Sequence, residues 1–151
     1  MAVLTSTGTL FSISIGEPAS QDVTGYGDLT YTAVGKVTNI PEFGANAQVV
    51  TLDPLETGIT EKYKGFINFG SMSIEAAYDE ADAGQILAET GVVGANKNAQ
   101  FAMKLEYQDG SIRYWQGGIF SYTENPGSAN SMVSTTFQVE INTAIIKVAA
   151  T

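Results

Sequence analysis

The sequence predicts a mainly β protein: a two-sheet sandwich or partial barrel, with one flanking helix at about residues 80–90 and a long loop or hairpin at about residues 41–69. Apolar and polar residues alternate with a period of two through most of the chain, which is typical of half-buried strands. A helical period occurs once. Charged residues make up only 15% of the chain, against about 25% in an average domain. No linker is visible, so we expect one domain over residues 1–151.

The first part of the chain predicts strands separated by turns. Phe11, Ile13 and Ile15 alternate with serines and indicate a strand. Residues 16–27 predict a turn or loop because they are rich in Gly, Pro, Ser and Asp, and residues 31–40 predict a second strand. Residues 41–69 combine glycines and prolines with large apolar side chains, which makes them too apolar for a disordered linker. We therefore expect this segment to pack against a partner surface.

The only confident helix follows a strand predicted at residues 71–78. Asp79 is the expected N-cap. Ala83, Ile86 and Leu87 form the expected apolar stripe, and Gly91 is expected to end the helix. The sequence thus places about three helical turns against one side or end of the sheet.

The C-terminal part returns to strands, predicted at residues 100–107, 112–116, 118–123 and 132–142. Asp109-Gly110 predicts a tight turn, because both residues tolerate positive φ angles. Residues 124–130 predict a loop, and residues 144–150 form a last apolar piece. The longest strand, 132–142, has one apolar face and one wet but nearly uncharged face.

Composition excludes several classes of function. Histidine and cysteine are absent, which removes disulfides, thiolate metal sites and Ser–His–Asp or Cys–His catalysis. We expect no enzyme activity, no cofactor and no metal. Seven Lys and Arg oppose 16 Asp and Glu, for a net charge of −9, so most of the surface should repel nucleic acid. No stretch approaches the roughly 18 apolar residues of a membrane span, and the N-terminus does not read as a signal peptide. We therefore expect no membrane partner and synthesis in a cytoplasm.

Three groups of residues could form a catalytic or binding site, but each also has a simpler structural explanation. The acidic residues Asp79, Glu80 and Asp82 could serve acid–base catalysis, but helix capping explains them better. Acidic loops could hold calcium, although the spacing of an EF-hand loop is absent. Trp115 with its neighbouring tyrosines could form a sugar-stacking platform, although aromatic residues at strand spacing more often belong to a core.

Several segments, taken in order, resemble the major tail tube proteins of long-tailed, siphovirus-like bacteriophages. The matching segments are Tyr31–Gly44 (YTAVGKVTNIPEFG), Thr57–Phe66 (TGITEKYKGF), Phe69–Glu75 (FGSMSIE), Asp79–Gly84 (DEADAG), the turn Asp109-Gly110-Ser111, and Ser131–Asn142, which ends in Glu-Ile-Asn. Each is short, and their order and spacing together carry the resemblance over about residues 28–145.

The resemblance implies a tail-tube-like fold and a structural, self-assembling subunit. Such proteins form rings, typically hexameric, that stack into a hollow tube through which DNA passes during ejection. The implied partners are other copies of the chain and the tape measure, terminator and tip proteins, with DNA passing without specific binding. The implied location is the virion tail, assembled in the host bacterial cytoplasm.

The resemblance and the strand alternation together nominate two surfaces. The first is a lumen lining whose carboxylates would repel passing DNA; its candidates are Ser71, Ser73, Glu75, Ser134, Thr136, Gln138 and Glu140. The second is a ring-stacking surface on the long loop; its candidates are Phe43, Lys62, Tyr63, Lys64 and Phe66. A one-residue error in register would move either set to the opposite face.

Two alternatives remain open from sequence. The chain could be an inner-tube subunit of a contractile injection or type VI-like secretion system, which shares the fold. It could also be a monomeric carbohydrate-binding β-sandwich, supported only by Trp115 and the nearby tyrosines.

Overall fold

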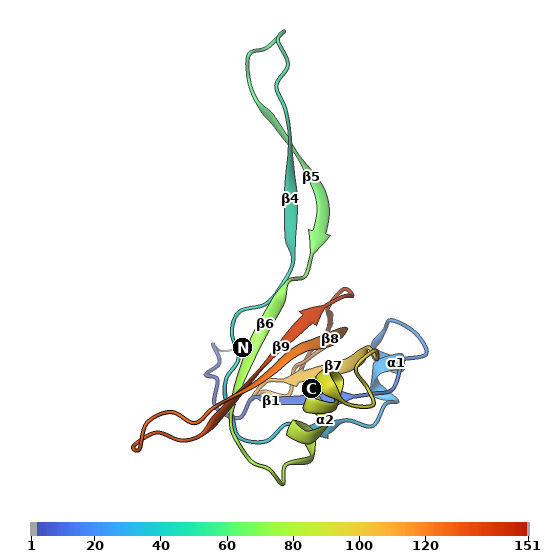
Figure 1. Cartoon of the computed structure of the whole chain (residues 1–151). Coiled ribbons are helices and arrows are strands. Elements are labelled where there is room, and N and C mark those ends of the chain that lie inside the picture. The colour runs from blue at the N-terminus through green and yellow to red at the C-terminus, as the bar shows by residue number, and fades with distance from the viewer. Residues whose placement is uncertain (1–2, 151) are drawn as a thin grey trace.

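The computed structural model describes residues 3–150, which form one curled sheet, a projecting hairpin and two helices (Figure 1). The elements are β1 (Leu10–Ser14), α1 (Val23–Gly27), β2 (Thr32–Ala33), β3 (Val37–Asn39), β4 (Asn46–Leu52), β5 (Glu61–Asn68), β6 (Ser71–Ala77), α2 (Ala83–Val93), β7 (Phe101–Glu106), β8 (Ile112–Asn125), β9 (Ser134–Ile141) and β10 (Ile146–Val148). Within these residues no helix is long and apolar enough to cross a membrane.

The large sheet has the strand order β2-β1-β7-β8-β9-β6-β3, and β10 pairs with β8. Every pairing is antiparallel. The sheet curls into a partial barrel, whereas β4 and β5 form a separate two-stranded sheet that stands away from it (Figure 1). The predicted mainly β fold with a partial barrel and one flanking helix is confirmed. The second sheet is the hairpin, predicted at residues 41–69.

The main core fills one face of the curled sheet beneath α2. Phe11, Trp115 and Phe137 are fully buried at its centre, with Phe11 ring centroids 6.2 Å from Trp115 and 6.1 Å from Phe137. Truncating such a side chain to alanine typically costs about 3–5 kcal/mol. The alternation predicted for β6 and β9 is confirmed, because every second residue of each strand is buried in this core.

Helix α2 begins and packs differently from the prediction. Its N-cap is Asp82, whose carboxylate accepts from the backbone N–H of Gln85 and of Gly35, each at 3.0 Å. The helix therefore starts about three residues later than expected from Asp79. The predicted stripe is wrong at two of its three positions, because Ala83 is exposed and Ile86 is 52% exposed, whereas Leu87 is partly buried and packs against the main core.

The face of α2 that meets the sheet is made of small residues. Gly84, Ala88 and Gly91 are buried there together with Gln85. A Cβ on Gly84 would overlap the carbonyl oxygen of Ala33. Helix and sheet thus approach closely at Gly84, and the larger side chains Leu87 and Val92 pack against the core beside this contact.

A second, smaller core covers part of the opposite sheet face. Residues 16–27 were predicted as a loop, yet they end in α1, capped by the Asp22 carboxylate, which accepts from Gly25 N–H at 2.8 Å. Tyr26 of α1 stacks on Tyr114 of β8 with ring centroids 5.3 Å apart. Because Tyr114 and Trp115 are buried on opposite faces, the sugar-platform reading is wrong.

Two other strand predictions change. The strand predicted at residues 31–40 divides into β2 and β3, because Lys36 adopts a positive φ of 61° between them. The strands predicted at 112–116 and 118–123 are one 14-residue strand, β8, with a register shift between Ile119 and Ser121.

Candidate assembly and channel surfaces

An open polar face lies on β6, β9 and the second half of β8, on the side of the sheet away from the main core. Register places Ser73 opposite Gln138, and Gln138 opposite Ser121. All seven residues predicted to line a lumen lie on this face: Ser71 pairs with Glu140, Ser73 with Gln138, Glu75 with Thr136, and Ser134 with Ala77. We call this surface the polar face.

Two further residues of β8 extend the polar face. Ser121 lies beside Gln138 and Thr123 beside Thr136. Sequence reasoning missed both because the bulge at Phe120 shifts the phase of the alternation. The alternation of polar and aromatic residues in Ser121-Tyr122-Thr123 was the sequence signal for this placement. In the structure, half-buried Tyr122 packs against the core, so its two neighbours lie on the opposite face.

The chemistry of the polar face is that of hydroxyl, amide and carboxylate groups. Gln138 donates from Nε2 to Glu140 Oε2 at 2.7 Å, so the two side chains form a local network. The charges on this face of β6, β9 and the second half of β8 are the carboxylates of Glu75 and Glu140. Such a surface repels phosphates and presents no cation to hold them.

One aromatic side chain interrupts the polar face. Phe120 is the extra residue of the β8 bulge and is 67% exposed. A Cβ on Gly118 would lie 2.7 Å from its ring, so the ring lies over the backbone of Gly118. The glycine therefore leaves space for a flat aromatic contact beside the carboxylates.

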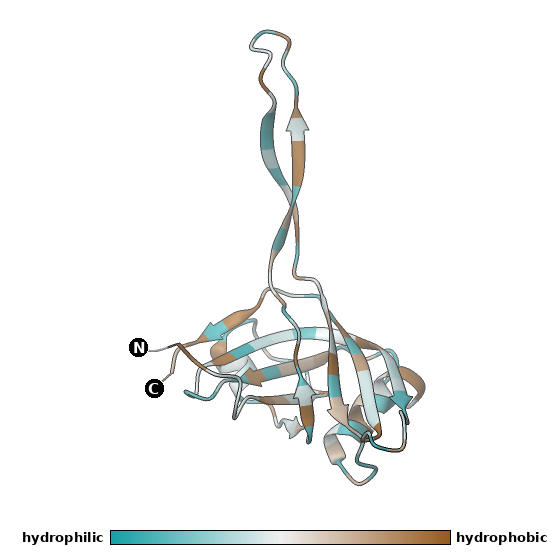
Figure 2. Cartoon of the chain, turned by 90° about the vertical axis from the view of Figure 1, so that its left-hand side faces the viewer, coloured by the Kyte–Doolittle hydropathy of each residue, from teal (hydrophilic) through white to brown (hydrophobic). Residues whose placement is uncertain are grey.

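The second candidate surface is the hairpin, residues 46–68, which projects far beyond the sheet (Figure 1). Its two strands pair only with each other, from Asn46 opposite Asn68 to Leu52 opposite Glu61. Apolar segments recur along its whole length (Figure 2). Isolated two-stranded hairpins are marginally stable in water, and large exposed apolar patches mark interaction surfaces.

Alternation gives the hairpin two distinct faces. Lys62 and Lys64 share one face, and beyond them a register shift interrupts the alternation before Phe66, which is 88% exposed. Tyr63 lies on the other face, where its hydroxyl donates to Glu61 Oε1 at 2.7 Å. That hydrogen bond raises the pKa of Tyr63.

The ring-stacking candidates are not all together. Four of them, Lys62, Tyr63, Lys64 and Phe66, lie on β5, whereas Phe43 lies at the base of the hairpin. The Phe43 ring packs against Trp115 with centroids 5.6 Å apart and is only half-exposed. The sequence prediction missed the exposed apolar residues of β4 and of the connecting loop, namely Val49, Val50, Leu52 and Leu55. Their exposure, not their residue type, makes them candidates for the same surface.

Known structures share this fold. A chain from the tail of the empty gene transfer agent (GTA) particle, with C6 symmetry, superimposes with a TM-score of 0.68 at 16% identity, covering 97% of this chain and 100% of that one. A chain of the SPP1 tail tube gives 0.65 at 11% identity, covering 96% and 78%. A chain of the sheath–tube complex of an extracellular contractile injection system (PVC) gives 0.65 at 8% identity, covering 97% and 92%. No protein-family model and no curated protein matches the sequence. The chain therefore has the fold found in tail and injection-system tube structures.

Proposed function

We propose that this chain is the tube subunit of a phage-type tail, in which rings of copies stack into a conduit for DNA. One observation carries the proposal: a chain with the tail-tube fold has both an open sheet face, polar with only acidic charges, and a projecting hairpin with exposed apolar side chains. Its role is structural and not catalytic.

The sheet edge supports lateral association into rings. The edge strand β3 has three residues, whereas its neighbour β6 has seven. β3 pairs with β6 only around Glu75 and Ala76. The other end of β6 thus offers backbone groups to a strand of an adjacent copy, which would join the sheets and protect the edge. The curl of the sheet would then continue around a closed ring, typically of six copies in tubes of this fold.

The polar face would line the lumen of that ring. Glu75 and Glu140 would repeat around the ring at every level of the tube. DNA within roughly one Debye length, about 8 Å, would feel this field. Like-charge repulsion, with no cation to bind phosphates, would let DNA pass without adhering.

The remaining assembly partners follow from this role. The hairpin would contact the next ring, the terminal rings would meet the terminator and tip proteins, and a tape measure protein would occupy the lumen before DNA. The tube would belong to the virion tail and assemble in the host bacterial cytoplasm.

Electron microscopy of the purified, concentrated chain tests the proposal. We expect rings or stacked tubes with a central channel, and a sedimenting fraction that grows above a critical concentration. A compact monomer at all concentrations would overturn the assignment.

A tube of a contractile injection system is the second candidate, since a chain of such a system shares the fold at a similar TM-score. Particles isolated from the producing cells distinguish the two. A tube enclosed in a contractile sheath supports the injection system, and a bare, DNA-filled tail supports the phage-type tail.

A further inference from the structure

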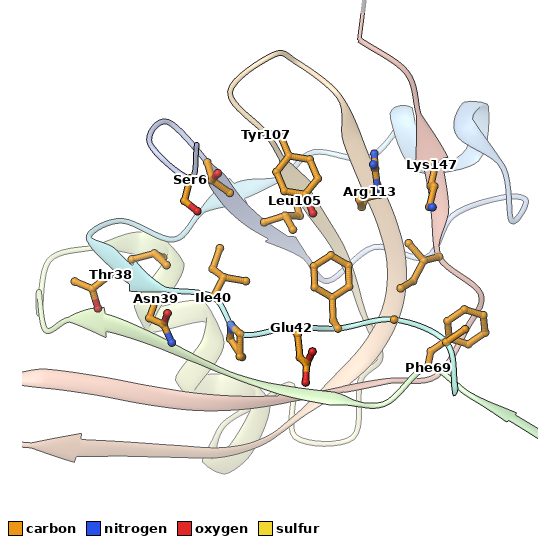
Figure 3. Close-up of a pocket in the computed structure, with 17 residues that line it drawn as sticks. Ser6, Thr38, Asn39, Ile40, Glu42, Phe69, Leu105, Tyr107, Arg113 and Lys147 are labelled. Atoms are coloured by element: carbon orange, nitrogen blue, oxygen red, sulfur yellow. The ribbon is translucent and has the colours of Figure 1, made fainter. Parts of the chain in front are cut away.

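A cavity of about 840 Å³ lies at the base of the hairpin, where the chain enters and leaves it. Figure 3 shows the segment leading into the hairpin crossing in front of β7 and β8, with the cavity between them. The large apolar side chains of the lining include Ile40, Phe43, Phe69, Leu105, Tyr107 and Ile145. We call this hollow the base cavity.

Two cations line the base cavity side by side. Arg113 of β8 and Lys147 of β10 are direct cross-strand partners. Like charges directly opposite each other destabilise a sheet. They are two of only seven cationic residues in the chain. An anionic partner would turn this repulsion into attraction.

The contacts of these cations within the chain supply little negative charge. Arg113 donates to a carbonyl of its own strand at 3.1 Å, and its guanidinium lies over the Tyr107 ring, 5.2 Å from the centroid. Glu42 also lines the cavity, but its carboxylate points away from both cations (Figure 3). Asp109, in the turn before β8, accepts two hydrogen bonds from Ser111; these bonds and, to a smaller extent, the charge of Arg113 lower the pKa of its carboxyl group.

The hairpin tip, residues 53–60, has the matching chemistry. Leu55 is fully exposed, Ile59 is largely exposed, and Asp53 and Glu56 carry negative charge. The tip is also ordered: Gly58 N–H donates to the Pro54 carbonyl at 3.1 Å. A preformed tip loses less conformational freedom on docking than a flexible loop would.

The position of the base cavity fits a repeating contact. About nine residues separate the base of β4 from the tip, which at roughly 3.3 Å per residue is about 30 Å. A copy displaced by that length along the hairpin therefore receives the tip of the copy below it at its own base cavity. Each copy along the tube can make this contact with the next one, as in other head-to-tail assemblies that form open filaments.

We propose that the hairpin tip of one copy docks in the base cavity of a copy in the next ring. Leu55 and Ile59 enter the apolar lining, and the tip carboxylates face Arg113 and Lys147. This inference rests on the proposed tube function and names the surface that receives the hairpin.

Crosslinking tests the contact directly because the chain has no cysteine. The variant carries Leu55→Cys at the tip and Glu42→Cys at the cavity, two positions about 30 Å apart within one copy. A short bismaleimide added to assembled tubes should then give a ladder of covalent multimers in denaturing gels. Each single-cysteine variant should give dimers at most. A matched variant pairing Leu55→Cys with Lys97→Cys, an exposed site outside the cavity lining, should give no ladder.

A charge exchange provides the second test. Glu56→Lys and Lys147→Glu should each raise the critical concentration about tenfold, and the double variant should restore it. Lys97→Glu makes the same charge change elsewhere and should leave assembly unchanged.

The outcomes separate this contact from the tube function itself. Tubes that give no ladder, or a double variant no better than the single variants, overturn the docking contact and leave the tube function standing. Absence of tubes from the unmodified chain overturns the proposed function and the docking contact with it.

Discussion

Phe66 provides a sharp test of the stacking surface, because its ring contributes almost nothing to the isolated copy. The side chain lies on β5 of the projecting hairpin and is 88% exposed. Phe66→Ala should change the free energy of unfolding of the monomer by less than about 0.5 kcal/mol. If the ring is buried against the next ring of the tube, the loss on assembly should be about 2–3 kcal/mol per copy. That corresponds to a critical concentration about 30- to 150-fold higher.

The measurement is the concentration at which tubes first sediment and appear by electron microscopy. Phe66→Leu keeps most of the apolar surface and serves as the matched control, with a much smaller expected effect. Urea unfolding below the critical concentration reports the monomer alone. If Phe66→Ala tubes form at the same critical concentration as tubes of the unmodified chain, the stacking role is refuted. If the variant instead loses much of the free energy of unfolding of the monomer, Phe66 is not a free side chain in the isolated copy.

Three further predictions concern the sheet, the lumen and the caps. Gly84→Ala should destabilise the chain by about 1–3 kcal/mol in urea unfolding, because the new Cβ overlaps a β2 carbonyl oxygen, whereas Gly27→Ala, with nothing within 4 Å of its Cβ, should have little effect. Tubes carrying both Glu75→Lys and Glu140→Lys should bind DNA at low salt and release it as salt rises; tubes with Gln at both positions should not bind, and equal binding by the two would contradict the lumen assignment. Hydrogen bonds from Gly25 N–H and Ser20 lower the pKa of Asp22 below 3.8, so its capping contribution is complete above that pH and is lost as pH falls through the lowered pKa. Asp22→Asn should remove this acid-dependent loss from a stability–pH profile, and an unchanged profile would argue against it.

The polar face was predictable because its signal is local. In β6 and β9 the period-two alternation survives into the structure, so Ser73, Glu75, Gln138 and Glu140 could be placed on one face from sequence. Where the backbone departs from the regular pleat, alternation no longer predicts which face a side chain occupies. The bulge at Phe120 inserts one residue into β8, and a single insertion reverses the phase of every later side chain.

The helix shows the opposite case. Apolar periodicity predicted that Ile86 faces the sheet, but close contact of Gly84 with the β2 backbone and of Gly91 with the Phe101 ring turns the small face inward. The capping signal was equally ambiguous, because Asp79 and Asp82 are both good caps. Asp82 is selected by a second hydrogen-bond donor, the N–H of Gly35, which lies 47 positions away in the chain. No local pattern encodes such a contact.

By itself, the sequence determined the class of the protein: a β-rich, acidic chain without histidine or cysteine, with a polar strand face and an apolar segment that needs a partner. Those properties follow from composition and from neighbours two residues apart. Only the tertiary structure decided that the apolar segment stands free as a hairpin, that Trp115 is core, and that Arg113 and Lys147 meet at the hairpin base. Each of these depends on segments far apart in the chain, whose proximity is set by sheet order and by the curl of the sheet.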